Sequence, residues 1–186
     1  MVIVWSRNVE HFKKVSIVFV LIVVGDFFLV LGNIIGGFEH NFVFLGFVPF
    51  SLAYIFLTFI YLKSYKLNIK DVLLAIPFLV LALLLYRTLN QFIEGIFLKG
   101  VSLVLLIVLL IMAWSSVLFL FKDTFPKNRS IMLAISGILM LACDLGVGFD
   151  LFYPDFYLIR NLIPINLVWL FYLPGWVLLA IASTES

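Results

Sequence analysis

Hydrophobic runs long enough to cross a lipid bilayer follow one another along most of the chain. A transmembrane helix needs about 20 predominantly apolar residues. The sequence offers segments close to this length at residues 15–37, 42–62, 71–87, 96–121, 130–152 and 161–182. Short polar segments separate them, which favours antiparallel neighbouring helices. Because unsatisfied backbone groups are too costly in hydrocarbon, such segments must be helical. The sequence therefore predicts an all-α, polytopic transmembrane helix bundle.

Composition agrees with this class. Of the 186 residues, 65% are hydrophobic and only 12% are charged, whereas average soluble domains are roughly half apolar and about a quarter charged. We expect one transmembrane helical domain over residues 15–182, an interfacial segment at 1–14 and a short polar tail at 183–186. The first run is too long for a signal peptide and lacks a small-residue cleavage site. The expected location is the cell or plasma membrane, as a multi-pass protein; the oligomeric state stays open.

Basic residues divide unevenly between the two ends of the predicted bundle. With the amino terminus inside, nine fall at inner ends and three at outer ends. The inner set is Arg7, Lys13, Lys14, Lys63, Lys66, Lys70, Lys122, Lys127 and Arg129; the outer set is Arg87, Lys99 and Arg160. Cytoplasmic loops carry such an excess of Lys and Arg. We therefore predict about six spans with both termini cytoplasmic.

Two aspartates, Asp26 and Asp144, lie near the middles of the first and fifth hydrophobic runs. A carboxyl group at the bilayer centre costs roughly 3 kcal/mol on insertion scales, so it needs a partner or a function. We expect the first and fifth helices to be neighbours and both carboxyls to face a common cavity, where they have a function. The alternative, in which each is a structural carboxyl bonded to a neighbouring helix, stays open.

Further polar side chains fall in the central or outer half of the predicted bundle. Four of them are expected to bind a substrate in the cavity: Asn33, Tyr54, Asn166 and Tyr172. By contrast, Arg87, Glu94 and Arg160 lie near span ends and are expected to be solvated or to contact headgroups. Trp176 is most simply an interfacial anchor. Pro174-Gly175 predicts the sharpest bend in the last helix, either an ordinary proline kink or a break that widens a cavity near the aspartates.

Several function classes are disfavoured by the sequence. It contains no Walker loop, dinucleotide fingerprint, G-x-S-x-G elbow or metal-ligand cluster. Both histidines lie in the N-terminal segment and first loop, where they cannot build a buried multi-histidine zinc site. The net charge of +2 comes from residues at span ends and gives no sign of nucleic-acid binding. We expect no cofactor and no metal, and a lipid bilayer as the immediate environment.

Five short segments, in order, carry a resemblance to a known family. They are Gly25-Asp26 with Phe28-Leu29; Phe44-Leu45-Gly46 with Phe50 and Tyr54; Met112-Ala113-Trp114; Gly137 to Asp144; and Phe171-Tyr172-Leu173. Over residues 20–182 the chain resembles the YhhN-type lysoplasmalogenase family of small polytopic membrane proteins. It departs from the family pattern at Tyr54, where a histidine is expected, at Cys143, where a serine is expected, and at Pro174-Gly175, in place of Ala-Gln.

The resemblance implies hydrolysis of the vinyl-ether bond of a lysoplasmalogen or a related membrane lipid, which would enter from the bilayer. Proton transfer to carbon gives an oxocarbenium ion that water then attacks. A carboxylic acid can donate that proton, and an ionised partner can stabilise the cation and activate water. We assign the acid to Asp144 and the base to Asp26.

Two other function classes remain. A proton-coupled transporter of a small solute would use the aspartates as proton carriers and Pro174-Gly175 as a hinge; the absence of two similar halves counts against it. A non-catalytic membrane scaffold derived from the enzyme family is suggested by the lost histidine and glutamine. Product formation, or a response to a pH gradient, would distinguish these classes.

Overall fold

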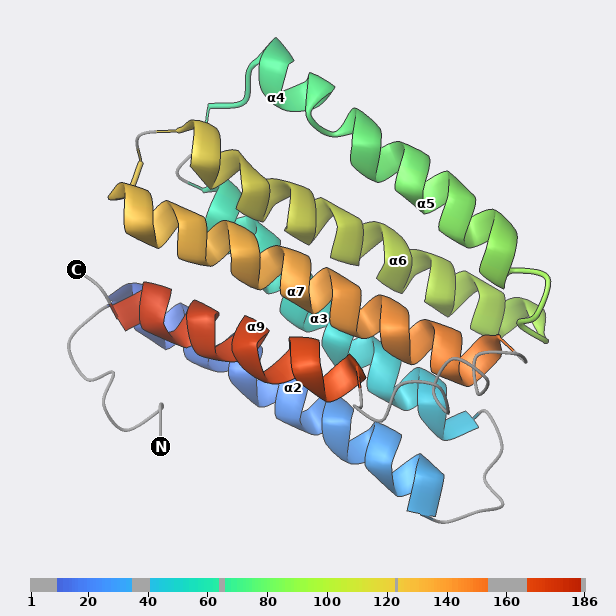
Figure 1. Ribbon diagram of the computed structural model, residues 1–186. Coiled ribbons are helices and arrows are strands. Elements are labelled where there is room, and N and C mark those ends of the chain that lie inside the picture. Colours follow the sequence, from blue (N-terminus) through green and yellow to red (C-terminus); the bar gives the residue numbers. More distant parts are fainter. Residues whose placement is uncertain (1–9, 35–40, 64–65, 123, 154–166, 185–186) are drawn as a thin grey trace.

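The computed structural model describes residues 10–34, 41–63, 66–122, 124–153 and 167–184, and this part of the chain consists of helices and their connections (Figure 1). The elements are α2 (Glu10–Ile34), α3 (Asn41–Leu62), α4 (Ile69–Leu73), α5 (Ile76–Leu89), α6 (Ile96–Val117), a 3-10 turn η1 (Leu118–Phe121), α7 (Lys127–Phe152) and α9 (Leu167–Thr184). The all-α class predicted from the sequence is confirmed for the described residues.

Four of the described helical segments are long and apolar enough, by length and composition, to cross a membrane. They are Leu45–Leu62, Ile69–Leu89, Ile96–Phe121 and Lys127–Phe152, and α9 adds the shorter apolar stretch Val168–Ser183. Large apolar side chains also cover the outer surface, as at Phe59 and Ile96, which are 71% and 92% exposed. Such extensive apolar exposure fits a lipid environment. These features indicate a membrane protein.

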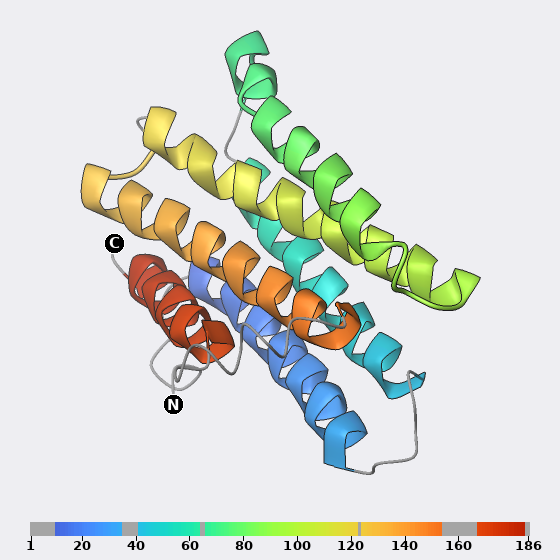
Figure 2. The ribbon, with the colours of Figure 1, turned by 45° about the vertical axis from the view of Figure 1, so that its right-hand side comes forward.

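The long helices run in alternating directions and pack as a bundle (Figures 1 and 2). Helix α2 packs along α3, and α7 packs along α9. Helix α6 contacts both α3 and α7, while α5 lies at the edge of the bundle against α6. The start of α2 and the end of α9 lie at the same end of the bundle as α4 and η1 (Figure 1). We call this the α4 end.

The third predicted span, 71–87, is divided into two helices. Helix α5 begins at Ile76, with Pro77 in its first turn, where proline needs no intrahelical donor. The preceding helix α4 begins with a capping box: the Asn68 side chain accepts from the Asp71 amide, and the Asp71 side chain accepts from the Asn68 amide. The proline at the start of α5 therefore accounts for the division, and the capping box fixes where α4 begins.

The buried Asp71 side chain also ties α4 to the end of α6. Its Oδ2 lies 2.7 Å from Lys122 Nζ, just beyond η1. The Trp114 indole of α6 donates to the Asp71 carbonyl at 3.0 Å. An ion pair and an indole hydrogen bond therefore hold the first turns of the α4–α5 segment, whose outer face is largely exposed, against α6.

Helix α9 is continuous through Pro174 and Gly175, which agrees with an ordinary proline position inside a helix and not with a break of the helix there. The reason is tertiary packing against α7. The Ser136 hydroxyl donates to the Gly175 carbonyl at 2.7 Å. A Cβ on Gly175 would meet the Leu139 Cβ at 3.3 Å, so glycine allows this close approach. Neighbouring helices can stabilise a membrane helix across a proline in this way.

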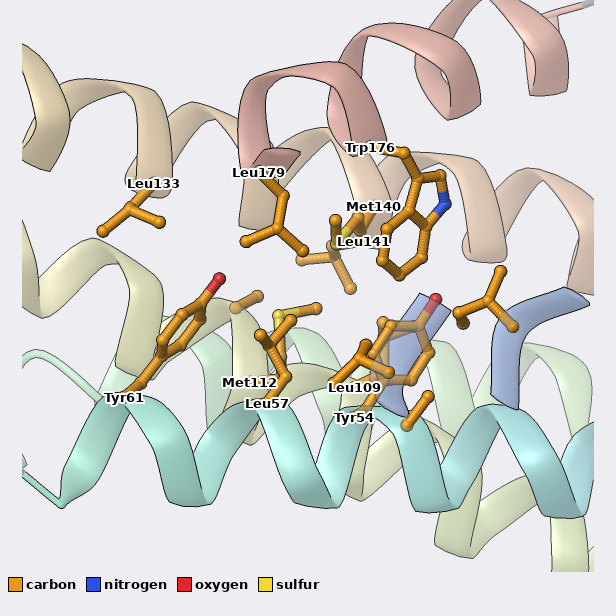
Figure 3. Close-up of a cluster of buried hydrophobic side chains, with 14 of the residues drawn as sticks. Tyr54, Leu57, Tyr61, Leu109, Met112, Leu133, Met140, Leu141, Trp176 and Leu179 are labelled. Carbon is orange, nitrogen blue, oxygen red and sulfur yellow. The ribbon is translucent and has the colours of Figure 1, made fainter. Parts of the chain in front are cut away.

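The core lies between α3 on one side and α7 and α9 on the other (Figure 3). Trp176 belongs to it and is only 7% exposed. Its ring lies 5.4 Å from that of Phe19 and 6.2 Å from that of Tyr172. The prediction of an interfacial anchor at Trp176 is therefore wrong, because this face of α9 is turned toward the bundle interior.

The crossing of α6 and α7 depends on Gly137. A Cβ added there would lie 2.0 Å from the Ser116 hydroxyl oxygen, and Ser116 is itself fully buried. Gly137→Ala is expected to destabilise the protein, because an overpacking penalty of about 1–3 kcal/mol should exceed the roughly 1 kcal/mol that alanine gains over glycine in a helix. Thermal unfolding in detergent can be followed by maleimide labelling of the single, buried Cys143.

Gly100 provides the matched control for Gly137 in the same test. It lies in α6, and a Cβ added there meets nothing within 4 Å. Gly100→Ala should therefore leave the unfolding temperature unchanged or raise it. Equal unfolding temperatures for the two variants would contradict the proposed importance of the Gly137 crossing.

Candidate intramembrane carboxyl site

Asp144 is held in the middle of α7 by a tyrosine from α3. The Tyr54 hydroxyl donates to Asp144 Oδ2 at 2.6 Å, across 90 residues of sequence. Tyr54 is 1% exposed, so its ring is fixed by the core, and it stacks on Phe50 with ring centroids 6.4 Å apart. Cys143, which precedes Asp144 on α7, is buried. Asp144 therefore accepts a hydrogen bond from a hydroxyl whose position is fixed by the core.

Asp26 has an equivalent partner. On α2, its Oδ2 accepts a hydrogen bond from the hydroxyl of Tyr172 on α9. The Tyr172 ring is oriented by edge contacts with Trp169 and Trp176, at 5.4 and 6.2 Å between centroids. Asp26 is partly exposed in the bundle. Each mid-helix aspartate thus has one tyrosine donor from a different helix.

These two hydrogen bonds join the two packed helix pairs, α2 with α3 and α7 with α9. One runs from α3 to α7 and the other from α9 to α2, so each crosses from one pair to the other. Figure 3 shows Tyr54 reaching from α3 toward the side of the core that carries Trp176. Tyr54 and Trp176 belong to the same buried core, and Tyr172 packs against it, so the two hydrogen bonds lie in one region of the bundle. The site is therefore a four-residue cluster between two helical pairs.

The cluster contains four of the six residues predicted for the site. The structure brings together Asp26, Asp144, Tyr54 and Tyr172, but each tyrosine donates to a carboxyl, a role that the sequence did not suggest. Asn33 lies in the last turns of α2, and Asn166 lies outside the described residues. Both stay predictions as substrate contacts.

The first and fifth predicted helices, α2 and α7, were expected to pack directly against each other. Helices α2 and α7 share no extensive interface; α3 and α9 provide the main contacts of each. Each carboxyl is instead bonded to a tyrosine of one of these helices, Asp144 to Tyr54 of α3 and Asp26 to Tyr172 of α9. A common substrate cavity at the aspartates stays a prediction.

The tyrosine pairing could have been suspected from burial alone. A tyrosine deep in a hydrophobic run must find a partner for its hydroxyl, and a carboxyl at similar depth is the strongest acceptor in reach. At the helix ends, Arg87 and Glu94 are exposed, as expected, and Arg160 lies outside the described residues. Within the described part of the chain, no three His, Cys, Asp or Glu side chains are grouped to hold a metal ion.

Comparison with known proteins adds no assignment to this site. No family model, no curated protein and no solved structure matches the chain. Function must therefore be argued from the cluster itself. Its chemistry is that of two carboxyls and two phenols, a set suited to proton transfer.

Proposed function

We propose that the protein is an integral-membrane hydrolase that cleaves the vinyl-ether bond of a lysoplasmalogen or a related lipid. The observation that supports this most is the pair of tyrosine-bound carboxyls, Asp26 and Asp144, at the middle of the bundle. Carboxyl groups inside membrane helices are expensive and usually functional. The sequence resemblance to lysoplasmalogenases through the segments around the two aspartates supports the same chemistry.

In this proposal the two carboxyls divide the proton chemistry. Protonated Asp144 donates a proton to the vinyl carbon farther from the ether oxygen. The electrons of the double bond form the new C–H bond, which leaves an oxocarbenium ion shared by the other vinyl carbon and the ether oxygen. Ionised Asp26 stabilises that cation and takes a proton from the attacking water. The hemiacetal then collapses to a fatty aldehyde and a glycerophospho-alcohol. Tyr54 and Tyr172 keep the carboxyls in place, and Asn33 and Asn166 contact the substrate.

The test is release of aldehyde from an alkenyl lysophospholipid by the purified protein in detergent. Aldehyde release by the wild-type protein supports the hydrolase. No release from any alkenyl lysolipid would favour the non-catalytic scaffold. The departures from the lysoplasmalogenase pattern at Tyr54 and Gly175 support that alternative. Proton-driven solute uptake into proteoliposomes without aldehyde would favour the transporter. Helix α9 is continuous through Pro174, the residue at which the transporter would need a hinge.

We further propose about six spans, with both termini cytoplasmic. Two observations support this orientation. The start of α2 and the end of α9 lie at the same end of the bundle. Among the described side chains, that end carries Lys14, Lys63, Lys66, Lys70, Lys122, Lys127 and Arg129, whereas the opposite end carries Arg87 and Lys99. An inner excess of basic residues is typical of membrane proteins.

Reporter fusions test this topology. Fusions after residue 186 and within residues 63–70 are both expected to report the cytoplasm, because both positions lie at the basic α4 end. A fusion between α5 and α6, at residues 90–95, should report the outer side and serves as the control. If the fusions at residue 186 and in the 63–70 connection reported opposite sides of the membrane, an odd number of spans would separate these two positions, and the predicted count would be wrong.

A further inference from the structure

Helices α2 and α9 meet along a narrow line of contact that includes Asp26. Side-chain contacts that join the two helices include the rings of Phe19 and Trp176, with centroids 5.4 Å apart, and the hydrogen bond from Tyr172 to Asp26. Helix α9 runs alongside α2 (Figures 1 and 2), but their interface is small compared with those of α2 with α3 and of α7 with α9. We call this line of contact the α2–α9 seam.

One side of the seam is covered by apolar side chains that face outward. Four large ones, each more than half exposed, lie three positions before and one position after Asp26 and Tyr172: Val23 and Phe27 on α2, and Trp169 and Leu173 on α9. Because α2 and α9 are antiparallel, equal offsets from two facing residues fall on the same side of the seam. These side chains therefore flank the hydrogen bond on the side that faces lipid.

The Tyr172–Asp26 hydrogen bond thus lies at the boundary between the bundle interior and the bilayer. Asp26 and Tyr172 are themselves partly exposed. Ile22 and Trp176, one turn from each of them toward the α4 end, belong to the buried core. Asp26 is also near the middle of its hydrophobic run, where a carboxyl beside hydrocarbon is costly and usually has a function.

We propose that the α2–α9 seam is a lateral entrance through which the hydrocarbon chain of a bilayer lipid reaches Asp26, and that the hydrogen bond from Tyr172 closes it. The flanking side chains are apolar, so they suit a hydrocarbon chain better than a hydrated solute. Movement of the Tyr172 side chain away from Asp26 opens the entrance. Only the identity of the lipid, an alkenyl lysolipid, rests on the proposed hydrolase.

A lipid-soluble carbodiimide, dicyclohexylcarbodiimide, tests the entrance in proteoliposomes. A protonated carboxyl adds across a C=N bond of this reagent, and the acyl group then moves from oxygen to nitrogen to leave a stable N-acylurea, which peptide mass spectrometry identifies. We expect labelling of Asp26. A water-soluble carbodiimide should label Glu94, which is exposed near a helix end, and should leave Asp26 unlabelled, because the entrance opens to lipid.

Two variants test the closure and the route separately. Tyr172→Phe should speed labelling of Asp26 at least about tenfold, as expected when one hydrogen bond to a charged group is lost. Val23→Trp keeps that hydrogen bond and should slow labelling at least about threefold, because an indole side chain of about 150–250 Å² covers the outward side of the seam. The matched control is Ile17→Trp. Ile17 is also exposed on α2 but lies nine residues before Asp26, on the opposite face of the helix, so its replacement should change labelling less than about twofold.

Protection of Cys143 from maleimide shows that each variant is folded, and Val23→Trp decides the matter if Tyr172→Phe does not fold. The entrance would be overturned by an unlabelled Asp26 in folded Tyr172→Phe, by equal labelling of Asp26 and Glu94 with the water-soluble reagent, or by equal effects of the two tryptophan variants. Aldehyde release together with any of these results would support the hydrolase without this entrance. Labelling that an alkenyl lysolipid slows without aldehyde release would support the entrance and count against hydrolysis.

Discussion

Replacing Asp144 by asparagine is expected to lower the rate of aldehyde release at least about a hundredfold, because removing a general acid forfeits its share of proton-transfer catalysis. Asparagine keeps the shape of the side chain and can still accept the hydrogen bond from Tyr54. The loss would therefore report proton chemistry more than folding. Asp26→Asn should cause a loss of similar size. The measurement is single-turnover aldehyde release from an alkenyl lysophospholipid in detergent.

Asp150→Asn is the matched control for this prediction. Asp150 lies on the same helix, six residues after Asp144, and its side chain is exposed. Its replacement should leave the rate within about twofold of wild type, since surface substitutions away from a site usually have small effects. Activity that survives both Asp26→Asn and Asp144→Asn, or that is lost only in Asp150→Asn, would place the chemistry outside the tyrosine-bound pair.

Replacing Tyr54 by phenylalanine is expected to lower the turnover rate about tenfold, with a smaller change in KM. The substitution keeps the buried ring and removes only the donor to Asp144. Because Asp144 is the protonated acid in this proposal, the hydrogen bond is one between neutral groups and is worth about 0.5–1.5 kcal/mol, and losing it lets the carboxyl leave its reactive position. Kinetics over a range of lipid concentrations separate turnover from binding. Tyr54 then acts as a positioning residue.

An effect on structure alone must be separated from this role of Tyr54. Unfolding temperatures should be measured for Tyr54→Phe and for Tyr86→Phe, which removes a hydroxyl from an exposed position on α5. Tyr86→Phe should change neither rate nor stability. If Tyr54→Phe raised KM while turnover stayed at the wild-type value, Tyr54 would contact the substrate, as the sequence first suggested.

The aspartate and tyrosine variants are the direct route from the cluster to a function. The four outcomes are distinct. Loss of turnover in the aspartate variants supports the hydrolase, product without aspartate dependence moves the site, proton-driven uptake supports a transporter, and none of these supports a scaffold.

The sequence by itself determined the helical class and marked Asp26 and Asp144 as candidate functional residues. Helix formation in hydrocarbon depends on the length of each apolar run, which is a local property, so the predicted run at 42–62 matches α3 closely. Asp26 and Asp144 were recognisable for the same reason, since the penalty for a buried carboxyl depends on depth and needs no knowledge of its neighbours. The exposure of Arg87 and Glu94 also follows from their place near helix ends.

Only the tertiary structure decided which side chains meet. Tyr54 reaches Asp144 across 90 residues and Tyr172 reaches Asp26 across 146, and such contacts depend on how the helices are ordered and rotated in the bundle. The same packing buries Trp176 and carries α9 past Pro174. No local pattern contains this information, because a helix in lipid is apolar on every face and the choice of the inward face is made by close packing and interhelical hydrogen bonds.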